Sequence, residues 1–284
     1  MRSRHFVLNS GAISLLISLC VIKLFPMPEL PDLQVFSSNL RKLFKGKKLT
    51  RLNIVNGKRI KTSAAKFKKA LEKSILKDVY REGKELRFKF SNDNILGLHL
   101  MLHGDLKLFK QKNNAKFTIA ELYFSNGKGL AITDFQGMAT ITLNPVEKDS
   151  PDALSGSLNK KYLTEKFNSK ANVKNLLMDQ QIIRGIGNAY ADEILWNAGI
   201  SPFSIGNKIP AAKITALGKT IKSVLKKAEK KIIKEHPDII SGEIRDFLDI
   251  HNSHKQKSPS GAKIKHETIG GRKTYYTDEQ TLYK

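Results

Sequence analysis

Three short stretches of this sequence hold residue types that can do chemistry. The first is Met27-Pro28-Glu29-Leu30-Pro31-Asp32, where a methionine precedes a proline as at a translation start, although 26 residues come before it. The second is QIIRGIGNAYADE at 181–193, and the third is GGRKTYYTDEQ at 270–280. Each places glycine or proline beside charged or amide side chains. That composition is typical of turns and helix starts, which hold such groups in fixed positions.

The segment 181–193 favours an anion site. A helical pattern ends, Gly185 and Gly187 provide tight turns, and a second helix starts. Backbone N–H groups at such a turn and helix N-terminus bind phosphate well, and the Asn188 amide would point at the same oxygen. The pattern alone is equally compatible with a structural turn. Pro28-Glu29 alone is most simply an ordinary helix start, because both residues are favoured there.

The elements that must position these groups are mostly strands in the first half of the chain. Apolar spacing after Glu29 predicts a helix that ends at Gly46, and a short helix is expected at Ser63–Lys73. Strand-like segments separated by turn signals then indicate an antiparallel β-sandwich. The expected strands are Leu49–Val55, Leu76–Arg81, Glu85–Phe90, Ile95–Leu102, Leu106–Phe109, Thr118–Phe124, Leu130–Thr133 and Thr140–Leu143.

After residue 156 the periodicity becomes helical. The expected helices are Lys160–Phe167, Ala171–Gln180, Gly187–Asn197, Ala211–Glu235 and Glu243–Ile250. Near the C-terminus, Lys263–Ile269 and Arg272–Thr277 alternate on either side of Gly270-Gly271 and predict a β-hairpin. The fold class is therefore α+β, with an N-terminal antiparallel β-sandwich and flanking helices followed by a helical domain with a terminal hairpin.

This layout divides the chain into five parts. They are an N-terminal extension (1–26), a sandwich domain (27–144), a linker rich in Pro, Asp, Ser and Gly (145–156), a helical domain (157–252) and the terminal hairpin region (253–284).

The charge of the chain favours a polyanionic partner. It has 50 Lys and Arg against 26 Asp and Glu, a formal net charge of +24 that is spread along the sequence. A folded protein this basic attracts nucleic acid, although a basic ribosomal-type protein would show the same balance. Cys20 is the single cysteine, so one chain can build neither a disulfide framework nor a cysteine zinc site, which fits a reducing compartment.

Taken together, the three stretches resemble the formamidopyrimidine-DNA glycosylase and endonuclease VIII family. The matching residues are MPELPD at Met27, RGIGNAYADEILWNAGISP at Arg184–Pro202 and GGRKTYYTDEQ at Gly270–Gln280. The resemblance runs from Met27 to the C-terminus. Its order matches too: a proline-led helix, a sandwich, a helix–two-turn–helix motif and a finger hairpin. Three motifs in this order are more specific than any one of them.

The resemblance implies a bifunctional DNA glycosylase and AP lyase with Pro28 as the nucleophile. An α-amino group has a pKa of about 8, so a useful fraction is unprotonated at neutral pH. Attack of the proline secondary amine on the deoxyribose C1′ gives an iminium (Schiff base) directly. The base leaves, and elimination then cuts the strand. Glu29 is implied as the acid/base that assists ring opening and proton transfers at the sugar.

This chemistry bears on the first 26 residues, because a proline inside a chain has no free amine. The segment has a basic start and an apolar run from Gly11 to Ile22, like a signal peptide or a short anchor. The run is short for a spanning helix, Lys23 interrupts it, and no small-x-small cleavage site follows. We therefore favour a translation start at Met27, or processing that exposes Pro28, and expect no membrane association of the mature form.

The resemblance also implies residues that contact DNA. Lys84 matches the family's turn lysine, which reaches the lesion and its phosphate, and His99 matches a histidine near the DNA backbone. Arg272 matches the arginine at the tip of the finger hairpin, where a guanidinium suits phosphate clamping. Lys84, Asn188 and Arg272 would converge on the phosphates around an extruded nucleotide. The alternatives are a solvated hairpin lysine at 84 and a packed strand histidine at 99.

One departure from the family pattern concerns zinc. Many members hold the finger hairpin with four cysteines and a zinc ion, but Thr277 and Gln280 stand where the second cysteine pair would be, and no first pair exists. This resembles the zincless-finger members, in which packing of residues such as Tyr275 and Tyr276 replaces the metal. We therefore predict no zinc and no other dissociable cofactor.

A second departure concerns the residues that fill the gap left by a flipped base. The family's Met-Ser-Gly segment reads Leu102-His103-Gly104, and its Asp-Pro-Arg-Arg-Phe-Gly loop reads DFQGMA at 134–139, without the arginine that pairs with the orphaned base. Filling the gap is part of the energy balance of flipping. Leu102, Phe135 or Met138 would serve as apolar wedges, and a preference for 8-oxoguanine opposite cytosine is left open.

The sequence thus predicts an enzyme of base excision repair that excises oxidised bases from damaged double-stranded DNA. We expect a cytoplasmic, bacterial-type, nucleoid-associated monomer. One alternative is a non-catalytic DNA-binding relative that keeps Asn188 and Arg272 but has lost the lyase chemistry. Another is a basic RNA-binding helix–two-turn–helix protein, which a preference for structured RNA over abasic duplex would favour.

Overall fold

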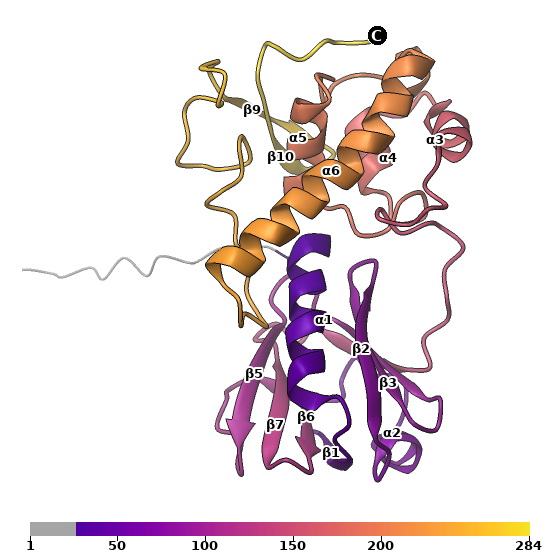
Figure 1. The fold of residues 1–284 in the computed structure, drawn as a ribbon, viewed down its shortest axis with the longest axis vertical. Coiled ribbons are helices and arrows are strands. Elements are labelled where there is room, and N and C mark those ends of the chain that lie inside the picture. Colours follow the sequence, from indigo (N-terminus) through magenta and orange to yellow (C-terminus); the bar gives the residue numbers. More distant parts are fainter. Residues whose placement is uncertain (1–26) are drawn as a thin grey trace, which may run out of the picture.

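The computed structural model describes residues 27–284, so the predictions for residues 1–26 lie outside the described residues. Figure 1 shows the sheets at one end of the molecule, most helices at the other end, and α1 (Leu30–Phe44) standing between them. The predicted order of strands, then helices, then a terminal hairpin is confirmed. Within residues 27–284, no helix is long and apolar enough to cross a membrane.

The strand half is a sandwich of two four-stranded antiparallel sheets, with the orders β1-β6-β7-β5 and β2-β3-β4-β8. The strands are β1 (Leu49–Ile54), β2 (Leu76–Glu82), β3 (Glu85–Phe90), β4 (Ile95–His99), β5 (Asp105–Lys110), β6 (Thr118–Phe124), β7 (Lys128–Thr133) and β8 (Thr140–Leu143). β4 ends earlier than predicted. Its last residue, His99, accepts the Met101 N–H at Nδ1 (3.0 Å), and Met101 has a φ of 55°, which turns the chain away from the sheet.

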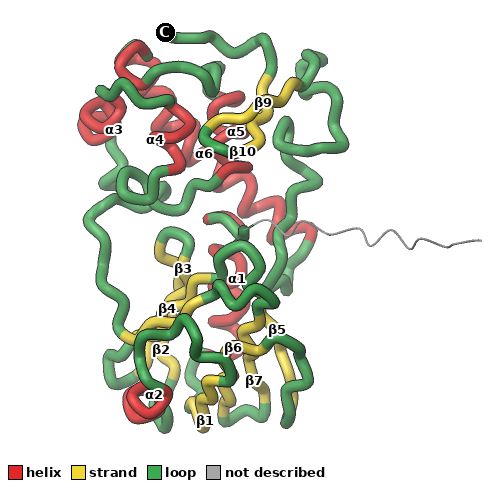
Figure 2. Tube along the Cα trace, turned by 180° about the vertical axis from the view of Figure 1, so that it is seen from behind, coloured by secondary structure: helices red, strands yellow, loops and turns green. Residues whose placement is uncertain are grey.

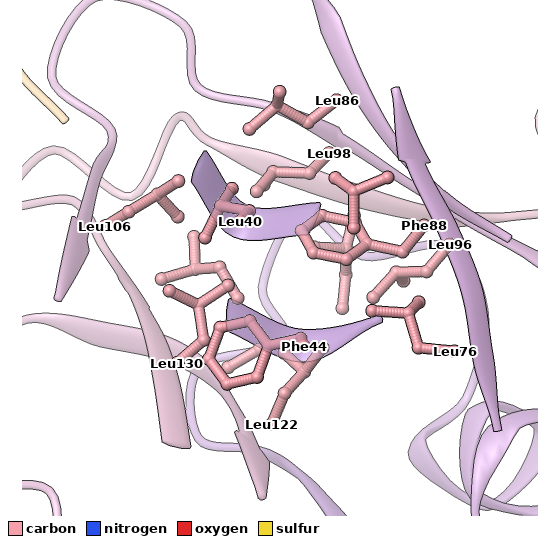
Figure 3. Packing of buried hydrophobic residues seen from close by; sticks show 14 of the residues in the cluster. Leu40, Phe44, Leu76, Leu86, Phe88, Leu96, Leu98, Leu106, Leu122 and Leu130 are labelled. Carbon is pink, nitrogen blue, oxygen red and sulfur yellow. The ribbon is translucent and has the colours of Figure 1, made fainter. Parts of the chain in front are cut away.

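Helix α1 supplies the side chains that fill the space between the two sheets. Leu33, Phe36, Leu40 and Phe44 recur at helical spacing and are fully or almost fully buried. Figure 3 shows Leu40 and Phe44 among leucines and a phenylalanine from the strands. The Phe44 and Phe124 rings stack with centroids 4.3 Å apart. α2 (Ala64–Leu71) packs beside β1. The C-terminal part of α1 is therefore part of the sandwich core.

The helical half has its own core. It comprises α3 (Lys160–Phe167), α4 (Val173–Met178), α5 (Asn188–Asn197), the short 3₁₀ helix η1 (Gly206–Lys208) and α6 (Ala211–Glu235). Their buried apolar residues cluster together with Leu30, the first residue of α1. One helix thus contributes to both cores, at opposite ends.

The predicted helix Glu243–Ile250 is wrong, because these residues are turns and irregular backbone. The buried carboxylate of Glu193 on α5 accepts the N–H groups of Asp249 (2.9 Å), Ile250 (2.8 Å) and His251 (2.8 Å). These donors therefore bond to a side chain from another element, and the helical pattern of the segment is overridden by a tertiary contact.

The terminal hairpin pairs β9 (Lys265–Ile269) with β10 (Arg272–Tyr276). Gly270 and Gly271 connect the strands with φ values of 55° and 75°, as a two-residue hairpin turn requires. β10 lies against α5 (Figure 2), where the buried Asp192 accepts the N–H of Tyr275 (2.9 Å). Lys174 on α4 pairs with Asp192 (2.7 Å) and donates to Thr274 Oγ1 (2.7 Å). A buried ion pair thus attaches the hairpin to the helices.

Replacing Lys174 by methionine is expected to lower the free energy of unfolding by about 3–5 kcal/mol, because it leaves the buried Asp192 without its main cation. Urea unfolding followed by circular dichroism measures the change. Lys166→Met is the control, since the Lys166–Glu165 pair is exposed to solvent and its loss should change the stability little. Equal effects of the two substitutions would contradict the assigned role of the buried pair.

Candidate active site at the junction of the two halves

Glu29 joins the start of α1 to the start of α5. Its carboxylate accepts the N–H groups of Gly187 (2.7 Å) and Ala189 (2.9 Å), and the residue is only 5% exposed. The helix begins after Gly187, which has no side chain to act as a cap. A carboxylate at a helix N-terminus is stabilised by the unpaired N–H groups and by the helix dipole. Glu29 therefore caps a helix from another part of the chain.

This contact corrects one expectation. The N–H of Gly187 is taken by Glu29, and the N–H of Gly185 donates to Gln180 Oε1 (2.9 Å). The turn does bind an anion, as its pattern predicts, but the anion is the protein's own carboxylate. The expectation that these two amides bind DNA phosphate is not met in this structure.

Both glycines are needed for the close approach of α1. Gly185 has a φ of 104°, and a Cβ there would lie 2.6 Å from Leu30 Cδ1. A Cβ on Gly187 would lie 2.4 Å from Glu29 Cδ and 2.6 Å from Lys84 Nζ. The Gly187 backbone, the Glu29 carboxylate and the Lys84 ammonium therefore meet at one point.

Lys84 reaches this point from the turn between β2 and β3. Asp152, in the segment between the two halves, holds that turn by accepting the Gly83 N–H (3.1 Å) and by binding the Arg81 guanidinium (2.5 and 3.0 Å). Burial lowers the pKa of Lys84, Glu29 opposes this shift, and the charges of Arg272 and Arg245 add to it.

His99 lines a small hollow together with Lys84 and Arg184. Burial lowers the pKa of His99, and the nearby Lys84 and Lys148 add to the shift while Glu85 opposes it. Because Nδ1 accepts the Met101 N–H, a neutral His99 carries its proton on Nε2. The structure thus places His99 next to Lys84, both half-buried.

Pro28 lies on the wall of a cavity of about 490 Å³ between the two halves. Leu102 and Phe135, two of the three proposed wedges, line the same cavity and are 49% and 55% exposed. The third, Met138, lies outside the lining, with its N–H bonded to the Asp134 carboxylate (2.8 Å). The complete lining is Pro28, Leu102, His103, Gly104, Asp105, Lys107, Lys116, Phe117, Thr133, Asp134, Phe135, Ser241, Gly242 and Glu243.

Asn188 and Arg272 lie where α5 meets the hairpin. Asn188 Nδ2 donates to the Lys273 carbonyl (2.9 Å), which ties the start of α5 to β10. Arg272 is exposed at the hairpin turn, and its charge is close enough to lower the pKa of Lys84. The structure therefore brings Lys84, Asn188 and Arg272 to the same region.

Sequence reasoning missed a cluster of charged residues beside Pro28. Arg245 donates to both oxygens of the buried Asp32 (2.9 and 2.6 Å) and to Glu243 (3.2 Å). Asp32 also accepts the N–H of Glu29 (2.9 Å). Asp32 is part of MPELPD, but nothing in that stretch indicates its partner Arg245. Glu243 and Arg245 were hidden by the wrong helix assignment.

The finger residues do not fit a zinc ion. The Thr277 N–H donates to Gln280 Oε1 (2.9 Å), and Gln280 Nε2 donates to the Ile200 carbonyl (2.8 Å). Tyr275 packs edge-on against His251, and Tyr276 against Phe203. Within residues 27–284, no group of three or more His, Cys, Asp or Glu could hold a metal ion. Thr277 and Gln280, at two of the positions where zinc ligands would stand, are engaged in hydrogen bonds, and aromatic side chains pack beside them.

Comparison with protein families matches two family models. The formamidopyrimidine-DNA glycosylase N-terminal domain matches residues 27–141, and the formamidopyrimidine-DNA glycosylase H2TH domain matches residues 150–236.

Full-length relatives and solved structures are similar over most of the chain. A formamidopyrimidine-DNA glycosylase of Lactobacillus gasseri is 31% identical over 278 residues, covering 91% of this chain and 100% of the relative. One of Mycoplasma mobile is 28% identical, covering 88% and 97%. The Lactococcus lactis enzyme, bound non-covalently to DNA containing an AP site, has a TM-score of 0.78, 25% identity and coverage of 88% and 98%. MutM in complex with carbocyclic 8-oxo-G DNA has a TM-score of 0.79, 26% identity and coverage of 89% and 100%.

Gly187→Ala is expected to lower the free energy of unfolding by about 1–3 kcal/mol, because the added Cβ would displace Glu29 and Lys84. Gly156→Ala is the matched control, since a Cβ there meets nothing within 4 Å. Its effect should stay within about 0.5 kcal/mol. Urea unfolding of both variants checks the difference, and a Gly187→Ala protein as stable as the control would contradict the close approach described here.

Proposed function

Because this chain belongs to the formamidopyrimidine-DNA glycosylase family, we propose that it is a DNA glycosylase of base excision repair with AP lyase activity, acting on damaged duplex DNA through the amine of Pro28. The observation that carries the proposal is the position of Pro28, next to Glu29 in the chain and on the wall of a cavity that Leu102 and Phe135 also line. An extruded nucleotide entering this cavity would bring its C1′ to the proline nitrogen. The relatives' names and their DNA complexes support this reading.

The reaction begins with Pro28 as a free secondary amine. Its nitrogen lone pair attacks C1′ and the bond to the base breaks. The sugar ring then opens to an iminium, and loss of a proton from C2′ allows elimination of the 3′ phosphate. The adjacent Glu29 transfers protons at the sugar oxygen. Its carboxylate is kept in place by the α5 N–H groups, so its position does not depend on the substrate.

Binding of the phosphates is assigned to the cations around the site. Lys84 extends from a turn that Asp152 holds at Gly83, and Arg272 is exposed on the hairpin, so both can contact the backbone on either side of the extruded nucleotide. Asn188 positions the hairpin and offers its amide beside them. Leu102 and Phe135 would enter the duplex gap.

We also propose that the finger works without zinc. The support is the donor set itself, since the side chains at 277 and 280 are a hydroxyl and an amide that are engaged in hydrogen bonds. Neither is a ligand that zinc prefers.

The alternative is a non-catalytic DNA-binding relative. One observation favours it for the 284-residue chain: the Pro28 nitrogen is then in a peptide bond with Met27 and cannot attack C1′. The phosphate-binding cations would be the same in either case, so only the amine distinguishes the two functions.

Protein whose first residue is Pro28, verified by mass, is expected to form a covalent complex with abasic-site duplex DNA in the presence of borohydride. The full 284-residue chain and a form with one glycine before Pro28 should bind the duplex but not be trapped, because their proline nitrogen is an amide. Binding without trapping in all three forms would refute the lyase and leave a DNA-binding protein.

Lys84→Met is expected to weaken binding to abasic duplex and to reduce the slope of log affinity against log salt by about one, since it removes one phosphate contact. Fluorescence anisotropy at several salt concentrations measures both. Lys89→Met is the control, because Lys89 lies exposed on the same hairpin. An unchanged salt slope in Lys84→Met would place its ammonium away from the phosphates.

A further inference from the structure

Glu243 faces the same cavity as Pro28, and the mechanism above gives it no role. It belongs to the irregular segment after α6 and contributes to the cavity wall with Ser241 and Gly242. Its side chain is only 10% exposed. A carboxyl group buried beside a nucleophile costs free energy, and its one ion-pair partner among the described residues, Arg245, is shared.

Arg245 does not neutralise Glu243 fully. The guanidinium binds both oxygens of Asp32 at 2.9 and 2.6 Å and reaches Glu243 at 3.2 Å. One cation thus serves two carboxyl groups, and the charge of Glu29 is close enough to act on Glu243 as well. Where buried carboxyl groups outnumber the cations beside them, the least well paired one keeps a proton.

Every charged or titratable group that faces this cluster enters that balance. Glu29 and Asp32 lie at the start of α1, and Lys84 lies in the β2–β3 turn. The ring of Tyr190 on α5 packs against the Arg245 guanidinium. The other titratable groups that line the cavity are His103, Asp105, Lys107, Lys116 and Asp134. Burial raises the pKa of Glu243 to about 8, with Arg245 opposing the shift and Asp32 and Glu29 adding to it. At neutral pH, Glu243 is therefore mostly an uncharged acid.

We propose that Glu243 is a further catalytic residue, the acid that protonates the departing base. When the Pro28 nitrogen forms its bond to C1′, the electron pair of the C1′–base bond goes to the base. The Glu243 O–H gives its proton to the nitrogen of the base that was bonded to C1′. A neutral base leaves, and Glu243 remains as a carboxylate. The N–H proton of the attached proline nitrogen then restores the acid through solvent, which balances the step.

Glu29 already has its role at the sugar oxygen, where the N–H groups of Gly187 and Ala189 fix its carboxylate. The two glutamates thus divide the work: Glu29 acts at the sugar and Glu243 at the base. The inference rests on the proposed function, but an abasic site has no base to protonate. Cleavage of abasic DNA therefore tests the proposed function without involving Glu243.

The experiment uses protein with a free Pro28 amine and two duplexes, one with a formamidopyrimidine lesion and one with an abasic site. Glu243→Gln is expected to slow single-turnover base excision about a hundredfold, while borohydride trapping on the abasic duplex stays within about twofold of the parent protein. Asp246→Asn is the matched control, an exposed carboxylate on the same segment, and should change neither rate.

The pH profile gives a second readout. The ratio of excision rate to abasic cleavage rate should be constant below the pKa of Glu243 and fall with rising pH above about 8, as the acid loses its proton. Glu243→Gln should lose this pH dependence, and Glu243→Asp should keep it at a reduced rate.

The outcomes separate the two proposals. Normal excision by Glu243→Gln, or equal loss of excision and trapping, would overturn the role of Glu243 as the acid while leaving the Pro28 mechanism intact. Absence of trapping by the parent protein would overturn both.

Discussion

The arrangement of this molecule depends on the hydrogen bonds that the Glu29 carboxylate accepts from the start of α5. Glu29 is the N-cap residue of a helix whose far end fills the sandwich core, and its carboxylate caps a helix in the other half. The two halves are therefore joined by the carboxylate of Glu29, a residue that is only 5% exposed. The Gly187 turn has to come close enough to donate its N–H, and this requirement explains why no Cβ is tolerated there. It also fixes Pro28, the preceding residue, at the edge of the cavity between the halves.

Burying Glu29 has electrostatic consequences for its neighbours. Asp32 closes the first turn of α1 by accepting the Glu29 N–H, which adds a second buried carboxylate, and Arg245 is held against it. Lys84 provides the other nearby cation, and its pKa is lowered because burial outweighs the attraction of Glu29. The site thus contains an ammonium that loses its proton more readily than usual and an acid, Glu243, that keeps its proton longer than usual. Opposed shifts of this kind are typical of sites that transfer protons near neutral pH.

The sequence predicted most of the fold because its elements are locally encoded. The α1 stripe, the alternating strands and the Gly270-Gly271 turn each carry a periodicity or turn signal that survives in the structure. The failures come from tertiary contacts. Residues 243–250 have a helical pattern, but the Glu193 carboxylate takes their N–H groups. The strand after Ile95 stops at His99 because a side chain accepts a backbone N–H two residues later. The amides of the two-glycine turn were predicted to bind a DNA phosphate, and no local pattern reveals that the Gly187 N–H bonds to the Glu29 carboxylate. Likewise, the Asp32–Arg245–Glu243 cluster joins residues more than two hundred positions apart, so it has no local signal.

Buried polar contacts hold the finger hairpin against the helices. Here the buried Lys174–Asp192 pair binds the side chain of Thr274 and the backbone of Tyr275, and Gln280 bonds to the backbone on both of its sides. These contacts attach β10 to α4 and α5, the same helices whose turn receives Glu29. The hairpin that carries Arg272 and the carboxylate beside Pro28 are therefore both attached to α5, the hairpin through Asp192 and the carboxylate at the start of the helix. A change that loosens the hairpin should consequently be felt at the site as well as in the finger.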